Sequence, residues 1–188
     1  MEILSKIEVQ VRVEEVIERI KQGLIFIHPT DTIYGLGCDA TNGKAVAKLR
    51  QLKKRPGNPF SIWAPSLQWI EENGVITAEA KEWRKKLPGP YTLILQLKNK
   101  KAVSGVVNDH SANIGVRLPN HWFGRVVEKL GVPIVTTSAN KAGEKFMTAL
   151  ENLDPEIAAR VDFMVAEGVK DGRPSKIIDL TTGKVRER

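Results

Sequence analysis

Two cations that stand two residues apart, Lys53 and Arg55, are well suited by type and spacing to bind phosphate groups. They lie at the C-terminal end of a predicted helix, residues 43–52, and a turn with Pro and Gly, residues 56–59, follows them. In an extended segment leaving that helix, alternating side chains point to one side, where both cations could bind a triphosphate. Cations near a helix C-terminus also interact favourably with the helix dipole. Residue types alone leave both interpretations open.

A second set of candidates follows a β-branched segment. Ser138 and Asn140 come directly after a predicted strand, residues 133–137. Hydroxyl and amide side chains at the carboxyl end of a strand can bind a nucleotide or an amino acid, but an ordinary turn has the same composition. Arg117, near the end of another predicted strand, could bind a carboxylate through two parallel hydrogen bonds or lie exposed.

Three other patterns do not support a site. Residues 35–40 match the G-x-G-x-x-A form of the dinucleotide fingerprint, but six residues separate Gly35 from the preceding predicted strand. The three histidines are far apart, and none has a second ligand at the spacing of a zinc site. Cys38 has no neighbouring cation or histidine to lower its pKa, so we interpret it as a buried residue. We predict neither a Rossmann site nor a metal bound by protein ligands.

Length and charge bound the class of protein. The 188 residues are the size of one domain, and we predict a single domain over residues 1–188. The formal net charge of +7 favours association with polyanions such as nucleic acids or phosphorylated metabolites, although a solvated basic surface would carry the same charge.

The cellular location is also an expectation from composition. No apolar run approaches the roughly 20 residues that span a bilayer, so we expect no membrane segment. The first residues lack the pattern of a signal peptide. The one cysteine cannot form an internal disulfide, which fits a reducing compartment, and we expect a cytoplasmic protein.

Apolar residues recur at helical and strand spacings in alternation, without a strict βαβ repeat. We predict helices over residues 13–20, 43–52, 78–87, 121–130 and 155–160. We predict strands over residues 24–28, 60–64, 91–97, 114–118, 133–137, 161–165 and 176–180. This arrangement favours an α/β fold with a mixed sheet over a regular doubly wound one.

Together, these segments resemble the YrdC/TsaC-like family over nearly the whole chain. Residues 28–37, HPTDTIYGLG, are similar to its P-T-[DE]-T-x-Y-G-L-G signature, and KKRP at 53–56 is similar to its K-x-R-P motif. Further motifs follow in the family's order: PGP with Thr92 at 88–92, IGVRLP at 114–119, and SAN with Gly143 at 138–143. An ordered set of motifs is far more specific than any one of them.

The resemblance implies a twisted mixed sheet with flanking helices and an open, basic cavity, the YrdC-like fold. It also implies a nucleotidyltransferase. L-threonine and bicarbonate would form N-carboxylated threonine, whose carboxylate attacks the α-phosphate of ATP and expels diphosphate. Mg²⁺ would accompany ATP, without a dedicated protein ligand. The product, threonylcarbamoyl-AMP, would pass to partner proteins that make N6-threonylcarbamoyladenosine (t6A) in tRNA, and the protein could contact tRNA or double-stranded RNA itself.

The resemblance also suggests roles for individual residues. Lys53 and Arg55 would be catalytic, because they would hold the ATP phosphates and stabilise the leaving diphosphate. The residues expected to bind threonine are Thr32, Arg117, Ser138 and Ser175. Besides the two cations, the residues expected to bind ATP are Asn58, Asn113, Asn140, Thr148 and Arg186.

Two alternatives stay open at this point. A paralogue similar to the YciO branch would keep the fold and the nucleotide cavity but have another activity. Lys176 and Phe146, which replace a usual threonine and a common serine of the family, favour that interpretation. A non-catalytic module that binds double-stranded RNA or tRNA through its basic concavity is the second alternative.

Overall fold

The computed structural model describes residues 1–141, 143–170 and 172–186. In this part of the chain, ten strands form one sheet in the order β1-β8-β2-β3-β7-β4-β6-β5-β9-β10. The strands are β1 (Glu2–Ser5), β2 (Phe26–His28), β3 (Gly35–Gly37), β4 (Ser61–Trp63), β5 (Tyr91–Gln96), β6 (Asn113–Arg117), β7 (Ile134–Ser138), β8 (Phe163–Ala166), β9 (Lys176–Asp179) and β10 (Lys184–Arg186). The helices are α1 (Lys6–Val11), α2 (Val13–Lys21), α3 (Gly43–Lys53), α4 (Leu67–Asn73), α5 (Ala78–Arg84), α6 (Gly124–Leu130), α7 (Pro155–Ala158) and the 3-10 turn η1 (Leu150–Asn152).

The sheet combines parallel and antiparallel neighbours, which confirms the predicted mixed α/β fold. The pairs β1–β8, β2–β8, β4–β6 and β5–β9 are parallel. The pairs β2–β3, β3–β7, β4–β7, β5–β6 and β9–β10 are antiparallel. Antiparallel pairing in the middle of the sheet brings β3, which follows the turn after β2, beside β7.

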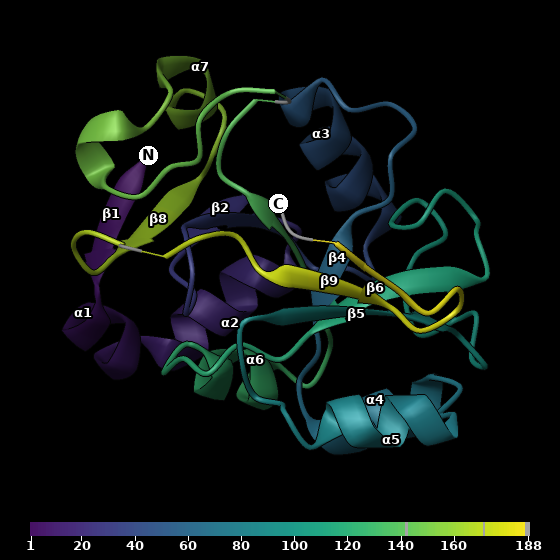
Figure 1. Ribbon diagram of the computed structural model, residues 1–188. Coiled ribbons are helices and arrows are strands. Elements are labelled where there is room, and N and C mark those ends of the chain that lie inside the picture. Colours follow the sequence, from purple (N-terminus) through teal and green to yellow (C-terminus); the bar gives the residue numbers. More distant parts are fainter. Residues whose placement is uncertain (142, 171, 187–188) are drawn as a thin grey trace.

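Two hydrophobic cores lie on opposite faces of the sheet. In β4, Ile62 belongs to one core and the adjacent Trp63 to the other, because successive side chains of a strand point to opposite faces. The core of Ile62 includes side chains of α3, α4 and α7, and the core of Trp63 includes side chains of α1, α2 and α6. In Figure 1, α3 and α7 accordingly lie on one side of β8 and β2, and α1, α2 and α6 lie on the other.

Most of the predicted elements are present, with shifted ends. The helix predicted over residues 121–130 begins at Gly124, because the preceding residues form a turn in which the His121 N–H bonds to the Pro119 carbonyl. The elements that the sequence did not predict are β1, α1, β3, α4, η1 and β10. They are short, and the apolar residues of α1, namely Ile7, Val9 and Val11, alternate as in a strand and do not recur at helical spacing.

The glycines of the G-x-G pattern form strand β3 and not a phosphate-binding turn. The imidazole of His28, on the neighbouring strand, lies against them. A Cβ at Gly35 would come within 2.8 Å of His28 Cε1, and one at Gly37 within 3.0 Å of His28 Cδ2. His28 is fully buried and stacks on Phe123, with ring centroids 5.7 Å apart. Packing of the imidazole therefore requires both glycines.

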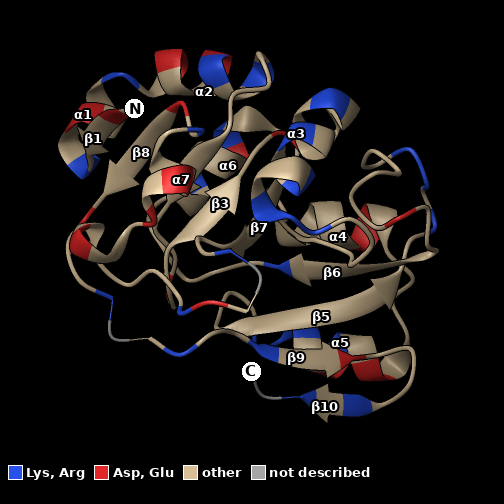
Figure 2. Cartoon of the chain, turned by 90° about the horizontal axis from the view of Figure 1, so that it is seen from above, with Lys and Arg blue, Asp and Glu red and all other residues tan. Residues whose placement is uncertain are grey.

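Charged side chains are distributed over several elements. Figure 2 shows Lys and Arg on α2, α3 and β10, with Asp and Glu among them on α2. The net positive charge is therefore not carried by one element alone. Among the described residues, none of the helices has both the length and the apolar character that crossing a bilayer requires.

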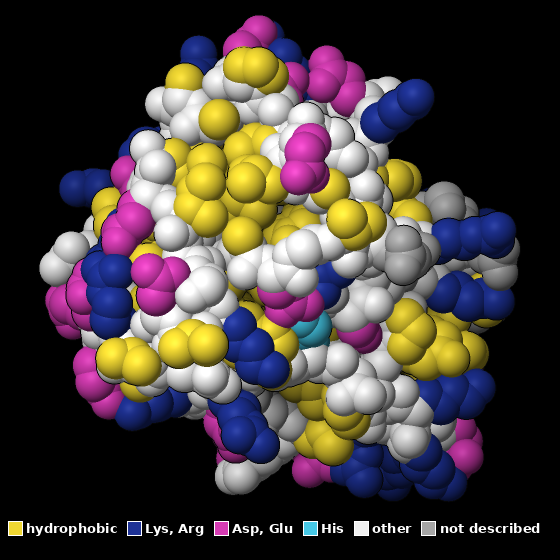
Figure 3. All heavy atoms as spheres, turned by 90° about the vertical axis from the view of Figure 1, so that its left-hand side faces the viewer, with side chains coloured by type: hydrophobic (Ala, Val, Ile, Leu, Met, Phe, Trp, Pro, Cys, Tyr) yellow, Lys and Arg dark blue, Asp and Glu magenta, His cyan; other side chains and the backbone are white. Residues whose placement is uncertain are grey.

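The β1 edge of the sheet exposes apolar side chains, namely Met1, Ile3, Ile7 and Val11. Figure 3 shows this side of the molecule, where hydrophobic side chains lie in groups between charged ones. Glu2 of β1 forms ion pairs with Arg12 and Arg19. Charge on an edge strand opposes pairing with the strand of another molecule.

Replacing Gly35 with alanine should destabilise the protein. The added methyl group would overlap the His28 ring, and overpacking of this kind typically costs about 1–3 kcal/mol. Urea unfolding at pH 7.5 should show a lower midpoint for Gly35→Ala. Gly124→Ala is the control, because a Cβ there would meet Trp63 Cζ2 at an ordinary 3.6 Å. An equal loss of stability in both variants would contradict this explanation.

Burial of His28 should make stability depend on pH. Burial lowers the pKa of His28 to about 3, although its bond to the Pro29 carbonyl opposes the change. Below about pH 6.5 the unfolded chain therefore takes up a proton that the folded protein does not. The free energy of unfolding should fall by about 1 kcal/mol per pH unit from pH 6.5 to 4.5 through this residue. Urea unfolding across that window should show a shallower slope for His28→Asn, and an unchanged slope would contradict the assignment.

Candidate functional site

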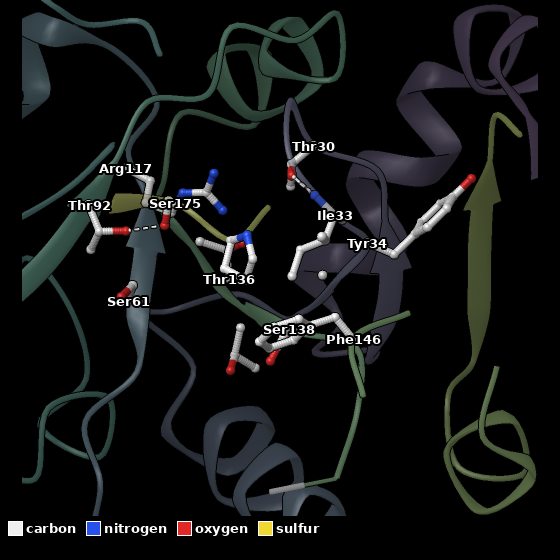
Figure 4. A pocket seen from close by; sticks show the side chains of 13 residues that line it. Thr30, Ile33, Tyr34, Ser61, Thr92, Arg117, Thr136, Ser138, Phe146 and Ser175 are labelled. Atoms are coloured by element: carbon white, nitrogen blue, oxygen red, sulfur yellow. Dashed lines mark hydrogen bonds between the residues drawn. The ribbon is translucent and has the colours of Figure 1, made fainter. Parts of the chain in front are cut away.

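A pocket opens over the central strands of the sheet (Figure 4). It has about 380 Å³ of empty volume, including its open side. Hydroxyl groups and the guanidinium group of Arg117 dominate its polar wall. The lining residues are Thr30, Ile33, Tyr34, Gly35, Ser61, Thr92, Arg117, Thr136, Thr137, Ser138, Phe146, Pro174 and Ser175.

Strand register places hydroxyl groups of the pocket on one face. Ser61 of β4 lies opposite Thr136 of β7, and Gly35 of β3 lies opposite Ser138. Ser61 stands two residues before Trp63, so both side chains point to the face that α2 and α6 cover. The pocket therefore lies where this face changes from aromatic to hydroxyl side chains.

Arg117, the last residue of β6, is buried and held by the turn that precedes β3. Its Nη2 donates to Asp31 Oδ1 at 3.0 Å and to Thr32 Oγ1 at 3.2 Å. Asp31 also accepts the backbone N–H of Asn120, and Thr30 Oγ1 accepts that of Thr32. Arg117 and Thr32, both predicted to bind threonine, are thus direct neighbours.

The segment before β9 lies over this turn and contributes the last hydroxyl group of the pocket. Ser175 is buried, and its hydroxyl lies 2.7 Å from that of Thr92 (Figure 4). A Cβ at Gly172 would come within 2.1 Å of the Thr32 carbonyl oxygen, so only glycine permits this close approach. Arg117, Ser138 and Ser175, predicted together, therefore line one pocket.

Lys53 is the last residue of α3, and its ammonium group is buried against the loop after β7. Nζ donates to the backbone carbonyls of Ser138 and Asn140, at 2.7 and 2.5 Å, and to Asn140 Oδ1 at 3.2 Å. Ser138 Oγ also donates to Asn140 Oδ1. The structure thus brings Lys53 of one predicted motif together with Ser138 and Asn140 of another.

The exit from α3 is not extended, so that part of the sequence prediction is wrong. Lys54 has φ 50° and ψ 42°, a left-handed conformation that ends the helix. Arg55 consequently has a different environment from Lys53: its Nη2 donates to the Pro59 carbonyl at 3.0 Å, and its guanidinium lies 5.4 Å from the ring centroid of Phe60. Arg55 is half-buried, whereas Lys53 is fully buried.

The other residues predicted to bind ATP lie on four separate segments. Asn58 is exposed in the loop between α3 and β4, and Asn113 begins β6. Thr148 precedes η1, where its Oγ1 accepts a hydrogen bond from Asn152. Arg186 is exposed at the end of the edge strand β10. None of these four belongs to the pocket lining, and their roles stay predictions.

Several pocket residues were not found by sequence reasoning. They are Thr30, Ser61 and Thr92. Asp31, the partner of Arg117, was not predicted either. A signal existed for Ser61, which is a hydroxyl residue between the buried Phe60 and Ile62 in a predicted strand. Such a residue must face away from that core.

A second polar cluster surrounds Glu167, which follows β8. Its carboxylate accepts hydrogen bonds from Trp122 Nε1 and Lys170 Nζ and lies 2.8 Å from His121 Nε2. Burial lowers the pKa of His121, although Glu167 acts in the opposite direction. The Glu167 N–H donates to the hydroxyl of Tyr34, so this cluster fixes a residue of the pocket wall.

The structure also locates the groups considered for metal and thiol chemistry. Within the described ranges, no three His, Cys, Asp or Glu side chains gather in an arrangement that could hold a metal ion. Cys38 is completely buried, and burial raises the pKa of its thiol. This agrees with its interpretation as a core residue.

This chain is similar in sequence to a protein family and to individual proteins of similar length. A family model for the Sua5, YciO and YrdC proteins, described as "Telomere recombination", matches residues 18–187. A threonylcarbamoyl-AMP synthase of Neisseria gonorrhoeae is 33% identical over 174 residues, which are 88% of this chain and 89% of the relative. A Methanocaldococcus jannaschii protein, provisionally named as the same enzyme, is 36% identical over 173 residues, 89% of this chain and 80% of the relative.

Solved structures show the same fold. Sua5 of P. abyssi in complex with L-threonine has a TM-score of 0.85 and 28% identity over 96% of this chain. The match spans only about half of Sua5, 54% of its length. E. coli YciO has a TM-score of 0.84 at 22% identity, over 99% of this chain and 92% of its own, which shows a common fold.

Lys53→Met should destabilise the protein even without a ligand. The substitution leaves buried carbonyl oxygens of Ser138 and Asn140 without their donor, which typically costs about 1–3 kcal/mol. Thermal and urea unfolding would measure the loss. Lys54→Met is the matched control, because the Lys54 side chain is 65% exposed and pairs with Glu156 only at the surface. Equal stability of the two variants would contradict the anchoring of the 138–140 loop by Lys53.

Proposed function

Because the chain belongs to the Sua5/YciO/YrdC family, we propose that it is a threonylcarbamoyl-AMP synthase. It would form threonylcarbamoyl-AMP and diphosphate from L-threonine, bicarbonate and ATP. The main structural support is that Arg117, Ser138 and Ser175, drawn from three distant segments, line one pocket beside Thr32. The identity to named synthases and the resemblance to threonine-bound Sua5 support the same activity.

The pocket has the chemistry to hold a small amino acid. Arg117 supplies a fixed positive charge for the carboxylate, and its neighbour Asp31 keeps the guanidinium oriented before the substrate arrives. The surrounding hydroxyl groups can accept hydrogen bonds from the ammonium group of threonine and form hydrogen bonds with its hydroxyl group. Ile33 and Phe146 offer apolar surface for its methyl group.

The reaction requires that the protein position the substrates and neutralise the charge of the phosphates. It requires no covalent nucleophile on the protein. The threonine amine takes up the carbon of bicarbonate with loss of water, which gives N-carboxylated threonine. Its carboxylate oxygen attacks the α-phosphorus of ATP, a new P–O bond forms, and the bond to the β-phosphate breaks to release diphosphate. Lys53 and Arg55 would stabilise the charge on the phosphates and on the leaving group. In this role the protein is a nucleotidyltransferase.

Mg²⁺ would arrive with ATP as part of that substrate, held by the phosphate oxygens. Asn58, Asn113, Asn140, Thr148 and Arg186 would contact the nucleotide. The product is a reactive mixed anhydride, so partner proteins that transfer its threonylcarbamoyl group to tRNA adenosine would consume it. The net charge of +7 would favour contact with tRNA in that process.

An assay of diphosphate release would test the proposal. Purified protein with ATP, bicarbonate, Mg²⁺ and labelled threonine should release diphosphate only when threonine and bicarbonate are both present. The label should co-migrate with an adenylate. Arg117→Lys should lower kcat/KM for threonine by about 100-fold, because lysine cannot bond bidentately to a carboxylate, and should leave the KM for ATP near wild type. Arg125→Lys, on the exposed side of α6, is the control.

Two outcomes would overturn the proposal in different ways. Diphosphate release that does not depend on threonine would favour a YciO-like paralogue with another nucleotide-linked activity. RNA binding that weakens steeply with salt, without any diphosphate release, would favour a binding module.

A further inference from the structure

Arg50, one turn before Lys53 on α3, holds two loops through backbone carbonyl groups. Its Nη1 donates to the carbonyl oxygens of Arg55, at 3.1 Å, and Asn58, at 2.9 Å. Its Nε donates to the carbonyl of Val106 at 2.9 Å, and its Nη2 to that of Val107 at 3.0 Å. A single guanidinium group thus joins residues 55–58 to residues 106–107.

The first of these loops carries the candidate phosphate-binding residues Arg55 and Asn58. Residues 56–59 are exposed to solvent, so they have little apolar packing of their own. The guanidinium group also lies over the ring of Phe60 at the end of this loop, with Cζ 4.6 Å from the ring centroid. Phe60 in turn donates its N–H to the Val107 carbonyl, which links the two loops directly.

The second loop leads to β6, whose first residue, Asn113, is another candidate for binding the nucleotide. Asn108, next to Val107, is buried and donates to the carbonyls of Ser111 and Asn113. The chain from Val106 to Asn113 is therefore tied into one unit. Arg50 fixes the distance between this unit and the loop of Arg55.

Burial of the charged Arg50 side chain costs free energy, and the need to fill space in the core does not explain why a charged residue stands here. The residue is only 9% exposed, and burial lowers its pKa, with nearby Asp109 acting in the opposite direction. Even a buried charge with an opposite charge beside it is weak evidence for stability, because the cost of removing charges from water can exceed the attraction between them. A guanidinium group at this position is better explained by its five N–H donors, which reach two loops at once.

We propose that Arg50 is a positioning residue for ATP: it holds the loop of Arg55 and Asn58 at a fixed place relative to the loop before β6. This inference rests on the proposed function for the assignment of ATP to that loop. Arg50 would not touch the nucleotide. It would act through the backbone of residues that do.

The test compares binding of ATP with binding of threonine. In Arg50→Met, the apparent KM for ATP and the ATP dissociation constant from calorimetry should rise by about tenfold, since small displacements of positioned groups have effects of this order. The KM for threonine should stay within about twofold, because Arg117 and its partners are held independently of Arg50. A general loss of structure would move both constants together.

Two further variants complete the design. Arg19→Met, on α2, removes a largely buried guanidinium that lies 4.4 Å from Phe163, and it should change neither constant. Arg50→Lys keeps the charge but cannot reach both loops, so it should also raise the KM for ATP, and it serves if Arg50→Met does not fold. A folded Arg50 variant with the wild-type affinity for ATP would overturn the inference. If the wild-type protein binds ATP but releases no threonine-dependent diphosphate, the proposed function fails, and calorimetry still decides the role of Arg50.

Discussion

The buried ammonium group of Lys53 is the interaction on which the arrangement of the site depends. An isolated charge in a protein interior costs several kcal/mol, so the chain must supply acceptors wherever this side chain lies. The acceptors are the carbonyls of Ser138 and Asn140 and the side-chain oxygen of Asn140. Because α3 and the loop after β7 are distant in sequence, satisfying this one charge fixes the helix end relative to the pocket wall.

The pocket itself follows from a change of side-chain type along one face of the sheet. Near β2 and β8 this face carries aromatic side chains, and His28 packs there so closely that β3 must be built from Gly35 and Gly37. At Ser61 of β4, Thr136 of β7 and Thr92 of β5 the same face carries hydroxyl groups instead. Apolar packing excludes water and sets the strands in register, and the register then aligns hydroxyl groups from strands that are far apart in sequence.

Sequence reasoning succeeded where the signal was local and failed where it depended on distant contacts. Periodicity found α2, α3 and most strands of the core. The grouping of Arg117, Ser138 and Ser175, which line one pocket, came from the resemblance to a family and not from a local pattern. Sequence reasoning could not find the left-handed conformation of Lys54, because a lysine gives no local sign of it. It also could not predict that Asp31 pairs with Arg117, since these residues meet only through the turn before β3.

The position of Lys53 near a helix C-terminus, which composition offered as an alternative to phosphate binding, is itself part of how the site is arranged. Arg50 and Lys53 stand three residues apart, so they extend from neighbouring positions near the C-terminal end of α3. The helix dipole is negative there and lowers the cost of bringing two cations close together. Each cation then binds carbonyl oxygens of a different loop, Arg50 those of Arg55 and Asn58 and Lys53 those of Ser138 and Asn140. The helix dipole therefore favours two buried cations at the end of α3. Through them, this one helix end positions the loops on both sides of the site.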